Sequence, residues 1–309
     1  MRAGAIMAVG DLVWDVLAQP DSMLLPGGDT TGRIALAPGG SAANVAAWVA
    51  RLGAPAAFVG AVGADVFGDL IVADLTREGV EGHIIRNQYD TGVIVVMIDR
   101  AGQRSMITNQ GADFHLQPAD LPVAAITRAA HVHITAWSLF TDPPRAAAIQ
   151  AAKVAKAGGA TVSFDPASYQ MIREMGRDTF DAIVAELPID IILPNRDEGM
   201  VLTGEREPAA IAHALRKRFR DAVVVLKLDK DGCYVSAHGY AQHHPTVDVT
   251  VVDATGAGDS FNAGFLAHYV RTGDIAGAAH LANSVGSWVV GRFGARPALD
   301  AAFASLLIK

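Results

Sequence analysis

The chain has 309 residues, of which 51% are hydrophobic and 18% charged, so it has ample apolar material for a wide core. The net charge of -7, with Lys and Arg scattered along the chain, argues against binding to nucleic acid. Asp11 and Asp15 interrupt the apolar N-terminal stretch too early for a signal peptide or a membrane span. The single cysteine, Cys233, excludes an intrachain disulfide and favours a reducing cytoplasm.

Short apolar runs that are typical of strands alternate with amphipathic segments that are typical of helices. The predicted strands are residues 5–10, 56–62, 131–136, 161–165, 190–195 and 222–228. The predicted helices are residues 42–52, 66–78, 143–157, 178–186, 207–219, 256–271 and 274–290. This βαβ alternation predicts one α/β domain whose mostly parallel sheet is covered by helices on both faces.

Two stretches, residues 12–37 and 83–108, break the alternation. Within the second, the segments HIIRN, GVIVVMID and QRSMI predict strands, with turns at Asp90-Thr91-Gly92 and Ala101-Gly102. Because both stretches adjoin glycine-rich turns, we expect a small separate sheet that forms a lid over the active site. The alternative is an extension of the edge of the main sheet.

The strongest motif is DATGAGDSFNAG, residues 253–264, between a strand-like TVDVTVV and an apolar helix. Gly256, Ala257 and Gly258 at a helix start leave N–H groups and the positive end of the helix dipole free to bind a phosphoryl group. Asp259, in the first turn, would accept the proton of an attacking hydroxyl. The alternative role for Asp259 is that of a helix N-cap.

This motif and the upstream PGGSAANVA, residues 38–46, resemble the two signature motifs of the ribokinase-like (PfkB) family of carbohydrate kinases. The resemblance extends, in the family's order, to Gly10–Asp15, Asn195–Glu198 and Arg292–Ala295. It implies one ribokinase-like domain over residues 1–309, a three-layer α/β/α fold with a β-sheet lid. It also implies transfer of the γ-phosphate of ATP to a hydroxyl of a sugar.

The substrate site is expected at the first glycine motif. Gly39 and Gly40 allow a close backbone approach, and the Asn44 amide can both donate to and accept from a sugar hydroxyl. The resemblance places the sugar here and matches Asp15, in preference to Asp11, to a sugar-binding aspartate. The alternatives without a binding role are a simple turn at Gly39 and Gly40, a solvated position for Asn44, and an Asp15 that only stabilises a turn. Arg104, in the lid, is either a ligand for a polar or anionic substrate or a surface residue.

The nucleotide and metal sites follow from the resemblance. Asn195 and Glu198 share a helix face and would organise Mg²⁺-bound phosphates through water, with a capping box or an exposed polar face as the alternatives. Residues 227–232 correspond to the family's glycine-rich turn near ATP, and Asp229 stands where glycine is common. The remaining nucleotide residues are Lys227, Gly232 and Asn283. A K⁺ site would involve Asp253, Thr255, Arg292 and Gly294, or this is an ordinary packed loop.

Two other classes of protein fit less well. A dinucleotide oxidoreductase would need Gly-x-Gly-x-x-Gly after the first strand, which is absent. A noncatalytic sugar-binding protein would normally have lost Asp259 or the glycines beside it. Ribose, fructose, a 2-keto-3-deoxy sugar acid and a nucleoside all stay open as substrates, and we favour a neutral sugar. The apolar GVIVVMID predicts a homodimer through the lid.

Overall fold

The structure, a computed structural model, describes residues 3–99, 104–109 and 111–306. Its main sheet has nine strands in the order β13-β12-β11-β10-β9-β8-β1-β4-β5. The strands from β11 to β5 in that order run parallel, and β12 and β13 are antiparallel at one edge. Their bounds are β1 Ile6–Val9, β4 Ala56–Gly63, β5 Glu81–Asn87, β8 His131–Thr135, β9 Thr161–Asp165, β10 Ile191–Ile192, β11 Val223–Lys227, β12 Cys233–Ala237 and β13 Tyr240–His244.

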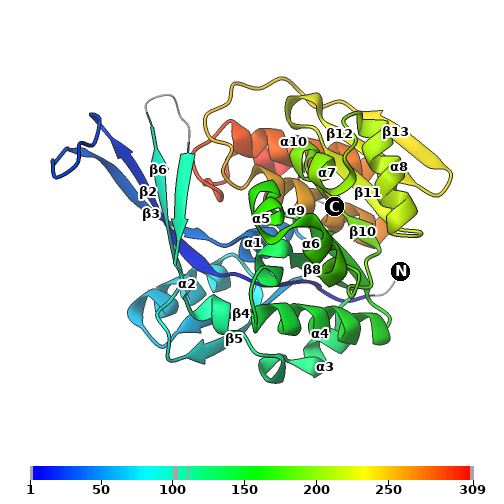
Figure 1. Ribbon diagram of the computed structural model, residues 1–309, viewed down its shortest axis with the longest axis horizontal. Helices are drawn as coiled ribbons and strands as arrows, with labels where there is room; N and C mark the ends of the chain where they lie inside the picture. The colour runs from blue at the N-terminus through cyan, green and yellow to red at the C-terminus, as the bar shows by residue number, and fades with distance from the viewer. Residues whose placement is uncertain (1–2, 100–103, 110, 307–309) are drawn as a thin grey trace.

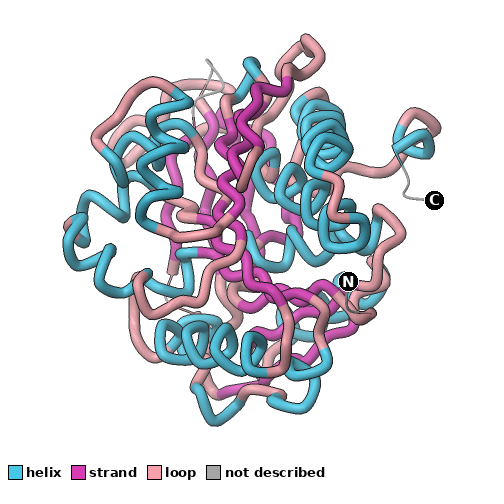
Figure 2. The backbone as a smooth tube through the Cα atoms, turned by 90° about the vertical axis from the view of Figure 1, so that its right-hand side faces the viewer, coloured by secondary structure: helices cyan, strands magenta, loops and turns pink. Residues whose placement is uncertain are grey.

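Helices cover both faces of this sheet, as Figure 2 shows, so the predicted α/β/α fold is confirmed. One hydrophobic core lies under α1 (Ser41–Arg51), α2 (Val66–Arg77), α9 (Ala257–Thr272) and α10 (Ile275–Val290). The other lies under α3 (Val123–Arg128), α4 (Pro144–Ala157), α5 (Tyr169–Met175), α6 (Arg177–Val184), α7 (Arg196–Thr203) and α8 (Pro208–Arg218). Over the described ranges, no helix is both long enough and apolar enough to span a membrane.

A second sheet of four strands stands to the left of the main body in Figure 1. Its order is β3 (Gly32–Gly39), β2 (Val13–Pro20), β6 (Val93–Ile98) and β7 (Arg104–Thr108). Leu17, Val96 and Ile98 are buried together on one of its faces. The small separate sheet that the sequence predicts is therefore present, and the alternative of an edge extension is wrong for these strands.

Two expectations need correction. Residues 83–87 belong to β5, which pairs in parallel with β4 in the main sheet, because α2 carries the chain back beside β4 in a βαβ unit. Residues 246–252 form no strand, since the chain leaves the sheet after β13 and gains no strand neighbour; Val247 and Val251 are exposed. No bounds were predicted from the sequence for β2, β3, β12, β13, α3, α5 and α7.

The carboxyl ends of the parallel strands gather polar residues at one edge of the main sheet. Asp165 ends β9, Lys227 ends β11, Asp11 follows β1 and Asn195 follows β10. The N-terminal turns of α1 and α9 meet at this edge, where Ser41 donates a hydrogen bond to Asp259. In open α/β sheets this edge is where ligands bind, so the fold concentrates the predicted site residues where a site is expected.

Candidate active site

Asp259 lies in the first turn of α9 and faces the first turn of α1. Its Oδ1 accepts a hydrogen bond from Ser41 Oγ at 2.7 Å, and its Oδ2 accepts one from Asn44 Nδ2 at 2.8 Å. Gly256, and not Asp259, is the N-cap of α9. Burial raises the pKa of Asp259 to about 6, although these two hydrogen bonds favour its charged form. Asp259 is therefore a carboxylate at neutral pH that remains a competent proton acceptor.

The glycine turn before Asp259 borders open space beside Gly258 and the Lys227 ammonium group, here called the anion recess. Gly256 is left-handed, with φ 71°, and a Cβ there would lie 2.7 Å from the Cα of Ala295. The Ala257 amide donates to the Ala254 carbonyl at 3.3 Å, whereas the next two amides, of Gly258 and Asp259, have no partner within the helix. A Cβ on Gly258 would meet only Lys227 Nζ, at 3.7 Å. The space before these amides can hold an anion, with an ammonium group beside it.

Lys227 is fixed below this recess by two side chains. Its Nζ donates to Asp165 Oδ2 at 2.6 Å and to Asn262 Oδ1 at 3.3 Å, and Asn262 also donates to Asp165. Burial opposes the charge on Lys227, but Asp165 and Glu198 raise its pKa, so the ammonium stays protonated. Lys227 thus lies next to the predicted anion hole.

Asp11 and Asp15 occupy different environments on the other side of the site. Asp11 accepts from the amides of Ser41 at 2.7 Å and Ala42 at 3.0 Å, and so caps α1 from outside the helix. Asp15 is 8% exposed and packs against Gly39, where a Cβ would lie 2.5 Å from Asp15 Oδ1. Gly40 has φ 92° and starts α1. Both carboxylate oxygens of Asp11 therefore accept hydrogen bonds from backbone amides, while Asp15 lies against the glycine turn.

Asn44 and Asp15 are held beside a buried arginine that the sequence analysis missed. Asn44 is 4% exposed, so the alternative of a solvated position is wrong. Arg296 Nε donates to Asn44 Oδ1 at 2.8 Å. Burial and the charge of Asp11 raise the pKa of Asp15 to about 7, while Arg296 opposes this rise. Arg104 begins β7, but its side chain lies outside the part of the chain that the structure describes.

Asn195 and Glu198 form a reciprocal capping box at the start of α7. Glu198 accepts from the Asn195 amide and from Asn195 Nδ2, both at 2.8 Å, and Asn195 Oδ1 accepts from the Glu198 amide at 2.8 Å. Glu198 is 2% exposed, and burial together with the charge of Asp165 raises its pKa to about 8. The capping-box alternative is confirmed, and the exposed polar face is wrong.

The turn after β11 borders a hollow of about 540 Å³. Asp229 adopts φ 52°, a left-handed conformation that explains why glycine is common there in the family. Gly232, with φ 86°, leaves no room for a Cβ, which would lie 2.1 Å from the His244 carbonyl oxygen. Asn283 donates to the carbonyls of His244 at 2.9 Å and Pro245 at 3.3 Å. The walls of this hollow include Leu228, Lys230, Asp231, Pro245 and Thr246, and neither Asn283 nor Gly232 lines it directly.

Asp253 joins the glycine turn to the C-terminal loop. Its Oδ1 accepts from the amide of Thr255 at 2.9 Å and its Oδ2 accepts from the amide of Gly294 at 2.9 Å. The Arg292 side chain instead donates to Trp288 O at 2.7 Å and pairs with Asp300. Among the described residues, no three His, Cys, Asp or Glu side chains are arranged to hold a metal ion.

The chain is similar to known proteins over most of the 309 residues. Residues 4–302 match the model of the pfkB family carbohydrate kinases. The chain is 35% identical to an ATP-dependent ribose-1-phosphate kinase of Halopiger xanaduensis, over 97% of each chain. It is 34% identical to a fructokinase of Klebsiella pneumoniae, over 85% of this chain and 84% of that one. A putative ribokinase II from Escherichia coli, solved with ATP and Mg²⁺, superposes with a TM-score of 0.82 at 26% identity and covers 95% of this chain and 94% of that chain.

Asp113 is a buried carboxyl group between the small sheet and the site. It lies in the 3-10 helix η1 (Ala112–His115), and a Cβ on Gly92 would lie 2.5 Å from its Oδ1. Within the described residues this Oδ1 has no hydrogen-bond partner. Burial and the charge of Asp11 raise the pKa of Asp113 to about 7. A carboxyl group with a raised folded-state pKa stabilises the protein at low pH, and this stability is lost as the pH rises through that pKa.

We therefore predict that Asp113→Asn raises the melting temperature by about 2–4 °C at pH 8.5, because the buried charge is removed. At pH 4, near the ordinary pKa of 3.8 where the unfolded chain also holds much of the Asp113 proton, the gain should be much smaller. Thermal unfolding of the unliganded protein at both pH values measures the difference. Asp90→Asn, at an exposed turn, is the control and should change the melting temperature little. An equal gain at both pH values would contradict the role of ionisation.

Proposed function

The chain belongs to the PfkB family of carbohydrate kinases and is a sugar kinase of that type, and we propose that it phosphorylates a hydroxyl of a neutral sugar with Asp259 as the base. One observation carries this proposal. Asp259 lies between a glycine turn suited to a phosphoryl group and the Asn44 amide, and two side-chain donors orient its carboxylate. A proton acceptor and an anion recess thus share one helix N-terminus.

The proposed reaction is an in-line phosphoryl transfer. As the sugar hydroxyl oxygen attacks the γ-phosphorus, its proton moves to Asp259, and the bond between that phosphorus and the β–γ bridging oxygen of ATP breaks to release ADP. The amides of Gly256 and Gly258 stabilise the charge on the transferred group. Lys227 adds a positive charge below the same recess. With a pKa of about 6, Asp259 is mostly ionised at neutral pH yet accepts a proton readily.

The charges near the sugar site support a neutral substrate. We propose that Asp15, Asn44 and the turn at Gly39 and Gly40 bind sugar hydroxyls. Asp15 already carries the repulsion of Asp11 and Asp259, so an anionic sugar would add to it. Arg296, the cation acting on Asp15, already donates to protein oxygens. A sugar 1-phosphate is the second candidate, since the relative from Halopiger xanaduensis is named for ribose 1-phosphate, and Arg104 would then be the predicted anion ligand.

The hollow beside residues 228–232 supports a nucleotide site after β11, the strand that ends at Lys227. Its volume of about 540 Å³ lies within the range of small-ligand sites. We propose that Asn283 and Gly232 act by shaping this wall, while Asn195 and Glu198 present the edge nearest the phosphates. Mg²⁺ would be held chiefly by ATP and water, with Glu198 bonding such a water, and it would neutralise phosphate charge.

The K⁺ site stays a prediction. The amides of Thr255 and Gly294 both donate to the Asp253 carboxylate. These hydrogen bonds can hold the loop together without a bound cation. Only backbone atoms of Arg292 would contribute, because its side chain pairs with Asp300. If K⁺ binds here, it steadies the glycine turn that precedes Asp259.

The small sheet is proposed as a lid and as a dimer surface. β3 runs directly into the glycine turn at Gly39, and β2 carries Asp15, so the sheet is continuous with the sugar site. Its other face has an apolar row across all four strands: Leu36, Val16, Val95 and Ile107. Leu36 is 59% exposed and Ile107 is 69% exposed. A second copy of the chain would bury this row.

The reaction and substrate are tested together by ADP release from Mg-ATP with fructose, ribose, adenosine, 2-keto-3-deoxygluconate and ribose 1-phosphate, each with K⁺ or Na⁺. We expect turnover with fructose or ribose. Turnover with ribose 1-phosphate alone would establish the second candidate, and sugar binding without ADP release would favour a noncatalytic protein. Equal rates in K⁺ and Na⁺ would remove the K⁺ site.

We predict that Asp259→Asn lowers kcat with the best substrate by about 10³-fold or more, because the amide cannot accept the proton. Sugar binding measured by calorimetry should persist. In the wild type, kcat/KM should fall as the pH drops below about 6, where Asp259 becomes protonated. The exposed Asp90→Asn variant serves as the control and should retain wild-type turnover. Near-normal turnover of Asp259→Asn would refute the assignment of the base.

We also predict that Leu36→Glu converts a wild-type dimer into a monomer, because it places a charge in the buried apolar row. Sedimentation equilibrium measures the mass of each. Val123→Glu introduces the same charge at an exposed position on α3 and should leave the dimer intact. A monomeric wild type at micromolar concentration would show that this face serves no self-association.

A further inference from the structure

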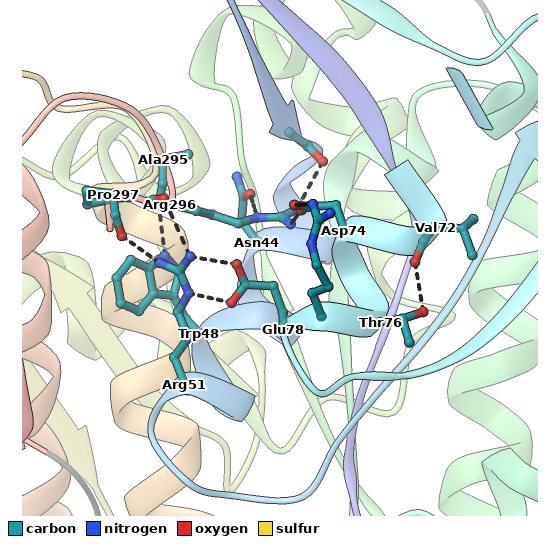
Figure 3. A network of polar contacts seen from close by, with 12 residues as sticks. Asn44, Trp48, Arg51, Val72, Asp74, Thr76, Glu78, Ala295, Arg296 and Pro297 are labelled. Atoms are coloured by element: carbon teal, nitrogen blue, oxygen red, sulfur yellow. Dashed lines mark hydrogen bonds and ion pairs between the residues drawn. The ribbon is translucent and has the colours of Figure 1, made fainter. Parts of the chain in front are cut away.

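Arg296 is a buried arginine in the C-terminal loop, and Figure 3 shows it reaching across to Asn44 and Asp74. Its side chain is only 2% exposed. Nε donates to Asn44 Oδ1 at 2.8 Å, Nη1 to Asp74 Oδ2 at 3.3 Å and Nη2 to the Gly39 carbonyl at 3.4 Å. A buried guanidinium is costly unless it is paired, so these partners hold it in one position.

The chemistry of these groups fixes the orientation of the Asn44 amide. A guanidinium has only donors and a carboxylate only acceptors. Asn44 lies between one of each, because Arg296 faces its Oδ1 and Asp259 accepts from its Nδ2 at 2.8 Å. A flipped amide would set N–H against N–H and oxygen against oxygen. Only one orientation therefore satisfies both neighbours.

We propose that Arg296 is a positioning residue for phosphoryl transfer, which fixes the Asn44 amide so that its N–H holds the carboxylate of Asp259. The inference rests on the proposed role of Asp259 as the base. Arg296 acts through Asn44, because its described contacts are with protein oxygens on Asn44, Asp74 and the glycine turn.

Removing Arg296 should change the acidity of Asp259 in a defined direction. Without the guanidinium, the Asn44 amide is free to turn its oxygen toward the carboxylate, which disfavours the charged form. The charged groups that also act on Asp259 are Asp11, Asp15, Asp165 and Lys227. They remain in place in an Arg296 variant. Arg296 lowers the pKa of Asp11 and of Asp15, so its loss favours their neutral forms and adds no repulsion toward Asp259. The turned Asn44 amide therefore raises the pH needed to ionise Asp259.

Arg51 provides a matched control, because it holds the same loop without contacting Asn44. Its guanidinium pairs with Glu78 and donates to the carbonyls of Pro297 at 2.9 Å and Arg296 at 3.5 Å, as Figure 3 shows. Arg51→Met therefore loosens the loop but leaves Arg296 and its bond to Asn44. It separates a general loss of stability from a loss of orientation.

The test compares kcat/KM from pH 5 to 9 and thermal unfolding for the wild type, Arg296→Met and Arg51→Met. We expect Arg296→Met to lower kcat/KM by about 10- to 100-fold, the loss expected for a hydrogen bond to a charged group, and to move the acid limb to higher pH. Arg51→Met should lower the melting temperature and leave the acid limb where it is. An acid limb that stays in place in folded Arg296→Met would overturn the proposal.

A double-mutant cycle decides the matter even if Arg296→Met does not fold. Arg296→Lys keeps a charge but cannot bond Asn44, Asp74 and Gly39 together with one planar group. In the wild-type background it should shift the acid limb part of the way, and in the Asn44→Ala background it should shift it no further. Additive shifts would show that Arg296 does not act through Asn44. Failure of the proposed function is distinguishable, because it would show as an active Asp259→Asn variant.

Discussion

The hydrogen bond between Asn44 and Asp259 is the contact on which the rest of the site depends. It joins the first turns of two helices across 215 residues of chain. For these turns to meet, α1 must begin close to the start of α9. Asp11 fixes the start of α1 by accepting hydrogen bonds from its first amides, and Gly40 turns the backbone into the helix. The contact also brings acidic groups close together, so burial and mutual repulsion raise their pKa values. Proteins are commonly less stable when their active sites require buried acidic groups close to one another.

Much of the fold could be predicted from local patterns. Helices with a strong amphipathic or apolar pattern, such as α4 and α9, begin and end within a few residues of their expected bounds. The two glycine motifs were recognisable because a run of small residues directly before a helix is typical of a ligand-binding turn. Parallel strands all end at the same edge of a sheet. Once the strand order is known, Asp259, Asn195 and Lys227 are therefore expected to lie near one another.

Contacts made by isolated residues could not be predicted in the same way. Arg296 stands alone in a loop, where no periodicity marks it as buried, and its partners lie on α1 and α2. The valines of residues 246–252 alternate like a strand, yet pairing depends on a neighbour that the sequence does not reveal. Residues 83–87 have strand character in either sheet, and the path of α2 decides which one they join.

The attachment of α1 to the C-terminal loop also sets the order in which the site is completed during synthesis. Trp48, Arg51 and Asn44 leave the ribosome before residues 295–297, in which each of them has a hydrogen-bond partner. Domains gain structure as the chain emerges from its N-terminus. A nascent chain that already contains Asp259 therefore still lacks the group that orients Asn44. On the proposed mechanism, the enzyme acquires full activity only after residues 295–297 have been translated.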